Sequence, residues 1–133
     1  METQVQGLGQ TLQMQIQEAT PERVVMTMPV TVQHHQPWGY LHGGASVSLA
    51  ETAATVGAYL NCPPGMLAFG QEINANHLRP VREGLLTATA LPAHIGRTSQ
   101  VWTIEIHNEQ QKLICVSRCT LAVIASHTGG TTK

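Results

Sequence analysis

Apolar and polar residues alternate along most of the chain, with one long exception in its middle. The alternation runs from Leu12 to Ile16 and resumes from Val24 to Val30, after the turn-like residues 19–22. Successive side chains of a strand point to opposite faces, so both stretches predict strands with one buried face. We expect these two strands to form a hairpin.

The exception is the segment 43–60, in which the spacing of apolar residues is helical. Within its residues 44–60, Glu51 is the only charged residue and small side chains fill most other positions. Such a helix has no polar face to offer to water, so we expect it to be buried on nearly all sides. Residues 61–65 (Asn-Cys-Pro-Pro-Gly) end it, because proline cannot continue the helical hydrogen-bond ladder.

Four further strands are predicted after the helix. They cover residues 66–79, 85–94, 100–107 and 113–124. Consecutive strands around a single apolar helix predict the α+β class, with one antiparallel sheet wrapped around the helix. The 133 residues are expected to form a single domain, in which residues 1–10 and 125–133 are flexible.

The low charge content changes this picture by suggesting partner subunits. Charged residues make up only 11% of the chain, whereas an ordinary soluble domain has about 25%. We therefore expect partner copies of the chain to cover much of its surface. The net charge of -1 and the scattered Lys and Arg argue against a nucleic-acid partner. The absence of a long apolar run and of a signal-peptide pattern argues against a membrane.

Cysteine and histidine usage argues against disulfides and metals. Cys62, Cys115 and Cys119 are odd in number and lack a CxxC spacing, so a reducing cytoplasm fits best and packing is their expected role. Four histidines have no metal-ligand spacing and are expected at the surface, namely His34, His35, His107 and His127.

Glu51 is the residue that most needs an explanation. It shares a helical face with Val47, Ala54 and Ala58, where a lone carboxylate is costly unless something compensates it. A structural interpretation pairs Glu51 with a cation or an amide, or lets it reach solvent. A chemical interpretation makes it a nucleophile or a base.

The residues before the helix favour the chemical interpretation. His42, Gly43 and Gly44 lead into it, so the N–H groups of the two glycines are among the unpaired donors of a helix amino end. Glycines also let a carbonyl approach, which is what an oxyanion hole requires. The alternative is that they only form a tight turn into the helix.

Spacing adds a constraint on how these groups can cooperate. Gly43 and Glu51 are eight residues apart, or about 12 Å along a helix, so one carbonyl cannot contact both in one subunit. Two antiparallel copies of the helix across a two-fold axis would bring Glu51 of one copy beside Gly43 of the other.

Several segments together resemble a known family. They are QPWGYLHGGAS (36–46), GQEINANHLRP (70–80), REG (82–84), HIGR (94–97) and QVW (100–102). These segments resemble the hotdog-fold thioesterases that cleave aryl-CoA. The similarity is strongest to the 1,4-dihydroxy-2-naphthoyl-CoA thioesterases of quinone (menaquinone) biosynthesis and to the enterobactin-pathway proofreading thioesterases, and it covers about residues 12–124.

The resemblance implies a role for each residue at the reaction centre. Glu51 would attack the thioester carbonyl or activate water, while the Gly43 amide polarises the carbonyl oxygen. Gln36 and His42 match positions that help hold the thioester, and Thr55 matches a small hydroxyl near the attacking group. The acyl-CoA would be the substrate of a homodimer or homotetramer, and no cofactor is implied beyond the CoA of that substrate.

The resemblance also implies which residues contact coenzyme A. They are Gly70, then His77, Leu78, Arg79 and Pro80, then His94, Ile95, Gly96, Arg97, Thr98 and Ser99. Arg79 and Arg97 are the natural phosphate partners in this set. The depth of the acyl pocket is expected to depend on Met66, Leu67, Phe69 and the helix.

Two other functions are compatible with the fold that the resemblance implies. A hotdog hydratase or dehydratase often has an Asp followed five residues later by a His, whereas Thr55 and Val56 follow Glu51 here. A non-catalytic acyl-CoA binding protein that acts as a sensor would need a DNA-binding segment, for which the residues before Leu12 are too few.

Overall fold

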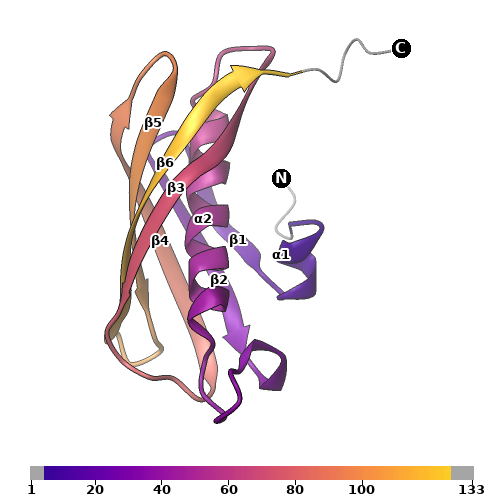
Figure 1. Cartoon of the computed structure of the whole chain (residues 1–133), viewed down its shortest axis with the longest axis vertical. Helices are drawn as coiled ribbons and strands as arrows, with labels where there is room; N and C mark the ends of the chain where they lie inside the picture. The colour runs from indigo at the N-terminus through magenta and orange to yellow at the C-terminus, as the bar shows by residue number, and fades with distance from the viewer. Residues whose placement is uncertain (1–4, 127–133) are drawn as a thin grey trace.

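The computed structural model describes residues 5–126, which form one strongly curved sheet and one long helix (Figure 1). In chain order the elements are α1 (Leu8–Thr11), β1 (Gln15–Thr20), β2 (Arg23–Val30), the 3-10 turn η1 (Val32–His34), α2 (Gly43–Leu60), β3 (Met66–His77), β4 (Gly84–Ile95), β5 (Ser99–His107) and β6 (Leu113–Ala125). The predicted helix is confirmed at both ends, and the four strands after it are confirmed within two residues.

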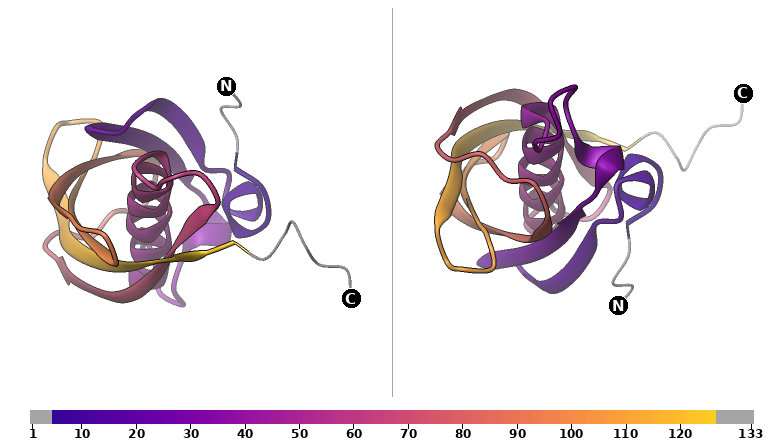
Figure 2. Two further views of the ribbon diagram at one scale, coloured as in Figure 1. Left: turned by 90° about the horizontal axis from the view of Figure 1, so that it is seen from above. Right: turned by 90° about the horizontal axis from the view of Figure 1, so that it is seen from below.

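The sheet is antiparallel throughout, with the strand order β1-β2-β4-β5-β6-β3. It curls around α2, so the helix packs against its concave face (Figure 2). The predicted α+β architecture is therefore confirmed. β1 and β3 are the edge strands of this sheet.

Small residues of α2 let the helix approach the sheet closely. A Cβ on Gly57 would overlap the indole ring of Trp102, so only glycine fits there. The Trp102 Nε1 donates to Gln100 Oε1 at 2.9 Å, and Gln100 Nε2 donates to the Ala58 carbonyl at 3.1 Å. Because each of these buried polar groups has a partner, the network fixes the carboxyl-terminal half of α2 on β5 without an unpaired donor.

The other face of α2 is only partly covered by its own chain. Tyr59 is 56% exposed and Leu60 41% exposed, while Glu51, Thr55 and Val56 are half-buried. The prediction that the helix is buried on nearly all sides is therefore wrong for a single chain. No helix within residues 5–126 is both long and apolar enough to cross a membrane.

The start of the chain differs from the prediction. Leu8–Thr11 form the short helix α1, with Gly9 buried, where a flexible lead was expected. β1 begins at Gln15 rather than at Leu12, because Gln13 has a φ of 61° and turns the chain before the strand. Ala19 and Thr20, assigned to the turn from the sequence, belong to β1.

His34 is a second correction, because it is buried (1% exposed) rather than at the surface. The Thr31 N–H donates to its Nδ1 at 3.1 Å, so the neutral ring carries its proton on Nε2 and donates to the Leu12 carbonyl at 2.8 Å. His35 and His107 are half-buried. At the other end of the chain Ala125 still belongs to β6, and residues 127–133, including His127, lie outside the described residues.

Candidate active site

The amino end of α2 is capped by the residue before it. The His42 Nδ1 accepts a hydrogen bond from the Gly44 N–H at 2.8 Å, and the His42 carbonyl accepts from Ala45 at 2.9 Å. The expectation that both glycine amides are unpaired is therefore wrong for Gly44. Among residues 5–126 the Gly43 N–H has no acceptor, so one donor of the predicted oxyanion hole is open.

A cavity of about 370 Å³ lies beside this open amide. Its lining residues are Gln36, Tyr40, Leu41, Gly43, Ser46, His77, Leu78, Arg79, Pro80 and Ile114. The fold thus brings together Gln36, Gly43 and one of the two predicted coenzyme A segments. Tyr40 and Ser46 were not predicted as site residues, although both lie within the segment 36–46 that carries the resemblance.

The imidazole of His77 forms the wall of the cavity beside Gly43. A Cβ at Gly43 would come within 2.8 Å of the His77 Nε2, so a larger residue would push the ring away. Gln36 also lines this cavity: its Oε1 accepts a hydrogen bond from the Trp38 N–H, and its own N–H donates to the Tyr40 carbonyl at 2.7 Å. These bonds fix Gln36 at the rim of the cavity.

The loop that carries Gln36 is tied to the segment after β3. The Leu41 N–H donates to the Val81 carbonyl at 2.7 Å. Arg82 donates to the Tyr40 hydroxyl at 3.0 Å, and its guanidinium carbon lies 4.6 Å from the centre of the Tyr40 ring. Two segments that are distant in sequence therefore form one wall.

Glu51 lies two helical turns further along α2, against β3. A Cβ on Gly70 would overlap the Glu51 Oε2, so any larger residue there would displace the carboxylate. The pairing of β3 with β6 shifts register between Gly70 and Glu72, and the resulting bulge lies beside the carboxylate. The sequence predicted Gly70 as a coenzyme A contact, whereas within one subunit its neighbour is Glu51.

The Glu51 carboxylate has no cationic neighbour and no hydrogen-bond partner within the part of the chain that the structure describes. Pairing with a cation or an amide therefore does not explain its position, and half-exposure to solvent remains. Burial, together with the carboxylates of Glu51 and Glu72, raises the pKa of Cys119 to about 12. Burial also raises the pKa of Cys62 and Cys115, which agrees with the packing role predicted for the cysteines.

Next to Glu51 the surface contains an apolar hollow of about 500 Å³. It is lined by Ile16, Ala19, Thr55, Val56, Tyr59, Leu60, Leu67, Ala68 and Phe69. Leu67 and Phe69, two of the residues expected to set the depth of the acyl pocket, are among these lining residues, and Met66 is not. The Thr55 hydroxyl donates to the Glu51 carbonyl at 2.8 Å, which leaves its oxygen able only to accept.

The second predicted coenzyme A segment lies elsewhere in the subunit. Residues 94–99 comprise the end of β4, the turn that follows it and the first residue of β5, and the turn is closed by the Gly96 N–H donating to the Ser99 carbonyl at 2.8 Å. Figure 1 shows this turn near the carboxyl end of α2, whereas residues 77–80 lie near its amino end. The 18 residues of α2 span about 27 Å, so one subunit does not bring the two segments together.

Three further predicted residues have less defined surroundings. Arg79 and Arg97 are exposed, and neither has an acidic partner among residues 5–126. His42 is also exposed and lines a separate hollow with His34 and His35 rather than the cavity beside Gly43. Because its Nδ1 accepts from Gly44, the neutral His42 ring carries its proton on Nε2, where a ligand could accept it.

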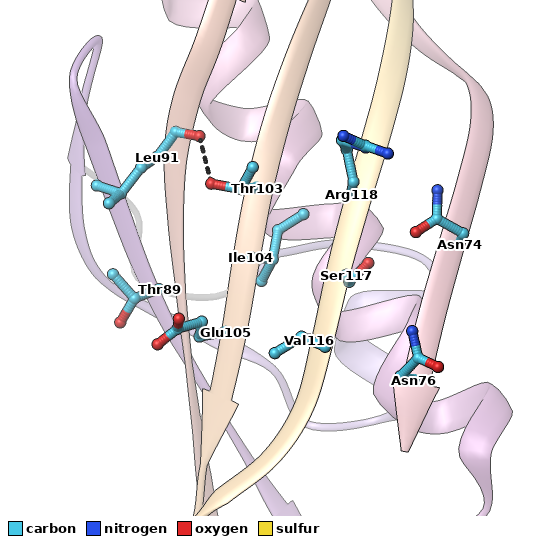
Figure 3. A pocket seen from close by; sticks show the side chains of 10 residues that line it. All are labelled: Asn74, Asn76, Thr89, Leu91, Thr103, Ile104, Glu105, Val116, Ser117 and Arg118. Atoms are coloured by element: carbon cyan, nitrogen blue, oxygen red, sulfur yellow. Dashed lines mark hydrogen bonds between the residues drawn. The ribbon is translucent and has the colours of Figure 1, made fainter. Parts of the chain in front are cut away.

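A further hollow, of about 390 Å³, lies on the outer face of the sheet and contains none of the predicted site residues (Figure 3). It is lined by Asn74, Asn76, Thr89, Leu91, Thr103, Ile104, Glu105, Val116, Ser117 and Arg118. The only hydrogen bond drawn among them joins Thr103 to the Leu91 carbonyl at 3.5 Å. No arrangement of nucleophile and base is present there. Within residues 5–126, no three His, Cys, Asp or Glu side chains are grouped so that they could hold a metal ion.

Comparison with known proteins gives a consistent result. A family model described as "Thioesterase superfamily" matches residues 39–115. A 1,4-dihydroxy-2-naphthoyl-CoA hydrolase of Listeria monocytogenes is 50% identical over 117 residues, covering 88% of this chain and 95% of the relative. The proofreading thioesterase EntH of Cronobacter sakazakii is 45% identical over 98 residues, covering 74% of this chain and 72% of the relative.

Solved structures agree with these sequence relatives. A thioesterase of Staphylococcus aureus, crystallised with a Gln→Ala substitution, superposes with a TM-score of 0.86 at 41% identity, covering 88% of this chain and 98% of that chain. The same protein with a Glu→Ala substitution superposes with a TM-score of 0.88 at 40% identity, covering 90% of this chain and 100% of that chain.

Proposed function

Because this chain belongs to the thioesterase superfamily and has its hotdog fold, as its sequence motifs predicted, we propose that it hydrolyses an aryl-CoA or related acyl-CoA to the free acid and coenzyme A. The observation that carries this proposal is the presence, on the same helix, of two groups that have no hydrogen-bond partner within residues 5–126. Within this part of the chain the Gly43 amide is open and the Glu51 carboxylate is unpartnered, and these are the groups that acyl transfer requires.

The chemistry follows from these two groups. The thioester oxygen accepts a hydrogen bond from the Gly43 N–H, where the dipole of α2 also stabilises the negative charge that develops. In one route the Glu51 carboxylate takes a proton from water while the water oxygen bonds to the thioester carbon. The carbon–sulfur bond then breaks, and the thiolate of coenzyme A takes up a proton.

In the alternative route Glu51 itself attacks. A carboxylate oxygen of Glu51 bonds to the thioester carbon, the thiolate leaves, and water then hydrolyses the resulting mixed anhydride to the acid and a restored Glu51. Both routes use the same carboxylate and the same amide. Both also need them within reach of one carbonyl.

Two subunits would complete the site. Antiparallel copies of α2 across a two-fold axis would bring Glu51 of one copy near Gly43 of the other. The half-exposed face of α2 and the edge strand β3 support this arrangement, because both offer uncovered surface beside Glu51. The same axis would bring residues 94–99 of one subunit toward residues 77–80 of its partner, so that Arg79 and Arg97 share one coenzyme A.

The acyl group would occupy the apolar hollow beside Glu51. Its lining contains little that could hydrogen-bond beyond Thr55 and Tyr59, which favours a flat apolar group such as an aromatic ring. The name of the Listeria relative supports an aryl substrate, since that protein is named for naphthoyl-CoA.

The separation of Gln36 and Glu51 supports their assignment to one site. The glutamine and the glutamate replaced by alanine in the Staphylococcus aureus thioesterase are separated by the same number of residues as Gln36 and Glu51 here. We assign Gln36 to hold the thioester group, with His42 supporting it from the amino end of α2 and Thr55 in a supporting position beside Glu51.

A hydrolysis screen tests the proposal. Purified protein is offered aryl-CoA, short-chain and long-chain acyl-CoA, and acyl-carrier-protein thioesters, and release of free thiol is measured. We expect the highest kcat/KM with aryl-CoA, and light scattering of the same sample should give a dimer or tetramer. Absence of thiol release with every thioester, or full activity in a stable monomer, would contradict the proposal.

A further inference from the structure

Ser46 is a buried hydroxyl without a partner. Its side chain is 0% exposed, and its Oγ has no hydrogen bond within residues 5–126. Other hydroxyls on the same helix behave differently, since Thr52 donates to the Ser48 carbonyl at 2.7 Å and Thr55 to the Glu51 carbonyl at 2.8 Å. The corresponding acceptor for Ser46, the His42 carbonyl, accepts from the Ala45 and Ser46 N–H groups but not from the Ser46 hydroxyl.

The position of Ser46 in the fold indicates a function for its hydroxyl. It lines the cavity beside Gly43, together with Gln36 and His77. Side chains of an α-helix lean toward its amino end, so a residue covers the surface beside the turn before its own Cα. Ser46 is three residues after Gly43, so its side chain leans toward the turn that contains Gly43.

We propose that the Ser46 hydroxyl is a second donor to the thioester oxygen, alongside the Gly43 N–H. This inference rests on the proposed function, because it assumes that the oxygen is held at Gly43. Two donors on one oxygen are the usual composition of an oxyanion hole, and the Gly44 amide, the other candidate, is occupied by His42. The buried hydroxyl is costly in the empty protein and gains its partner when the substrate enters.

The first test compares Ser46→Ala with Ser117→Ala. Ser117, on β6, is the other buried hydroxyl without a partner among the described residues, and it does not line the cavity beside Gly43. Using benzoyl-CoA, we expect Ser46→Ala to lower kcat on the order of 10²-fold with little change in KM, because the bond strengthens as charge develops on the oxygen. Ser117→Ala should leave kcat unchanged.

Stability separates this role from packing. Both substitutions remove a buried hydroxyl that has no partner, so neither should lower the melting temperature. Ser46→Cys, which keeps the shape with a weaker donor, should give a kcat between those of Ser46→Ala and the wild type. An equal loss of kcat in Ser46→Ala and Ser117→Ala, or a loss that follows a lower melting temperature, would overturn the role of Ser46.

A second measurement does not depend on turnover. Raman difference spectra of benzoyl-CoA bound to the Glu51→Gln protein report the carbonyl stretch, which falls in frequency as hydrogen bonds polarise the bond. Adding Ser46→Ala should raise that frequency, and adding Ser117→Ala should not. An unshifted band would overturn the Ser46 assignment even if the wild type hydrolyses benzoyl-CoA. A wild type without hydrolysis but with the expected band shift would overturn only the proposed function.

Discussion

The amino end of α2 and its middle differ in almost every property that matters for acyl transfer. The amino end faces a cavity lined by both polar and apolar residues; within residues 5–126 it has an open Gly43 amide, an unpartnered Ser46 hydroxyl and the His77 ring, but no carboxylate. The middle has the Glu51 carboxylate against Gly70 and an apolar hollow, but no hydrogen-bond donor aimed at it within residues 5–126.

This difference supports the proposal that the two regions are halves of one site. Holding either group without a partner costs free energy. Neither the donor at the amino end nor the carboxylate in the middle can catalyse acyl transfer without the other. The halves are about 12 Å apart along one helix, which is too far for one carbonyl. The predictions below separate the halves, from the largest expected effect to the smallest.

Removing the charge of Glu51, in the middle of α2, should have the largest effect on turnover. Glu51→Gln keeps the length of the side chain but cannot attack a carbonyl or take a proton from water, so we expect turnover to fall on the order of 10² to 10⁴-fold. The melting temperature should stay the same or rise, because no cation within residues 5–126 pairs with Glu51.

The exposed carboxylate Glu105, on the outer face of the sheet, provides the matched control. Glu105→Gln should leave turnover unchanged. Turnover and melting temperature are measured on the same samples, and the fold is checked by circular dichroism. Full turnover in a folded Glu51→Gln protein would remove Glu51 from the mechanism.

Gly70→Ala should impair the same region by displacing the Glu51 carboxylate rather than by removing its charge. The added methyl would occupy the place of the Glu51 Oε2 and displace the carboxylate. A shift of about 1 Å in a reacting group can cost about 10²-fold in rate, so we expect a loss of that order in kcat. Alanine suits a strand backbone at least as well as glycine, so the melting temperature should not fall. A variant with normal kcat would show that the contact with Gly70 does not position Glu51.

Much of this arrangement could be predicted from the sequence, and the exceptions have physical causes. The pattern around α2 was predictable because a single charged residue in a small-residue helix is rare, and because helix ends follow local rules at Gly43 and Pro63. The start of β1 was not predictable, since a single left-handed residue, Gln13, breaks an otherwise regular alternation.

Long-range contacts explain the remaining differences. The buried His34 has a local pattern of a surface residue, and its burial depends on a bond to Leu12, distant in the chain. The Gly44 N–H is not open because it donates to the His42 ring. That bond depends on the rotamer of His42, which the spacing of residues cannot specify. The contact between Gly70 and Glu51 depends on a bulge in β3.

Hybrid dimers test whether the halves come from different subunits. Glu51→Gln damages one half, and Gly43→Ala damages the other, because its methyl would meet the His77 ring. Each homogeneous variant should be nearly inactive. A hybrid dimer, isolated with two affinity tags, has one site with both changes and one site with neither, so it should recover about half of the wild-type turnover. A hybrid as inactive as its parents would place both halves in one subunit.

The smallest effect is expected at the two arginines, which lie at opposite ends of α2. Arg79 lines the cavity at the amino end, and Arg97 lies in the turn near the carboxyl end. If both hold phosphates of the same coenzyme A across two subunits, either change to Ala should raise KM by about tenfold with little change in kcat, because a phosphate far from the carbonyl is bound equally in ground and transition states.

Salt should distinguish this electrostatic role from packing. Exposed charges are screened over about 10 Å at 0.1 M salt, so the KM difference between each variant and the wild type should shrink as salt rises. Arg118→Ala is the matched control, because Arg118 is also exposed but lies on the outer face of the sheet. Its KM should follow that of the wild type at every salt concentration. If Arg79→Ala raised KM and Arg97→Ala did not, the coenzyme A would be bound by the amino-end region alone, and the two ends of α2 would not share one substrate.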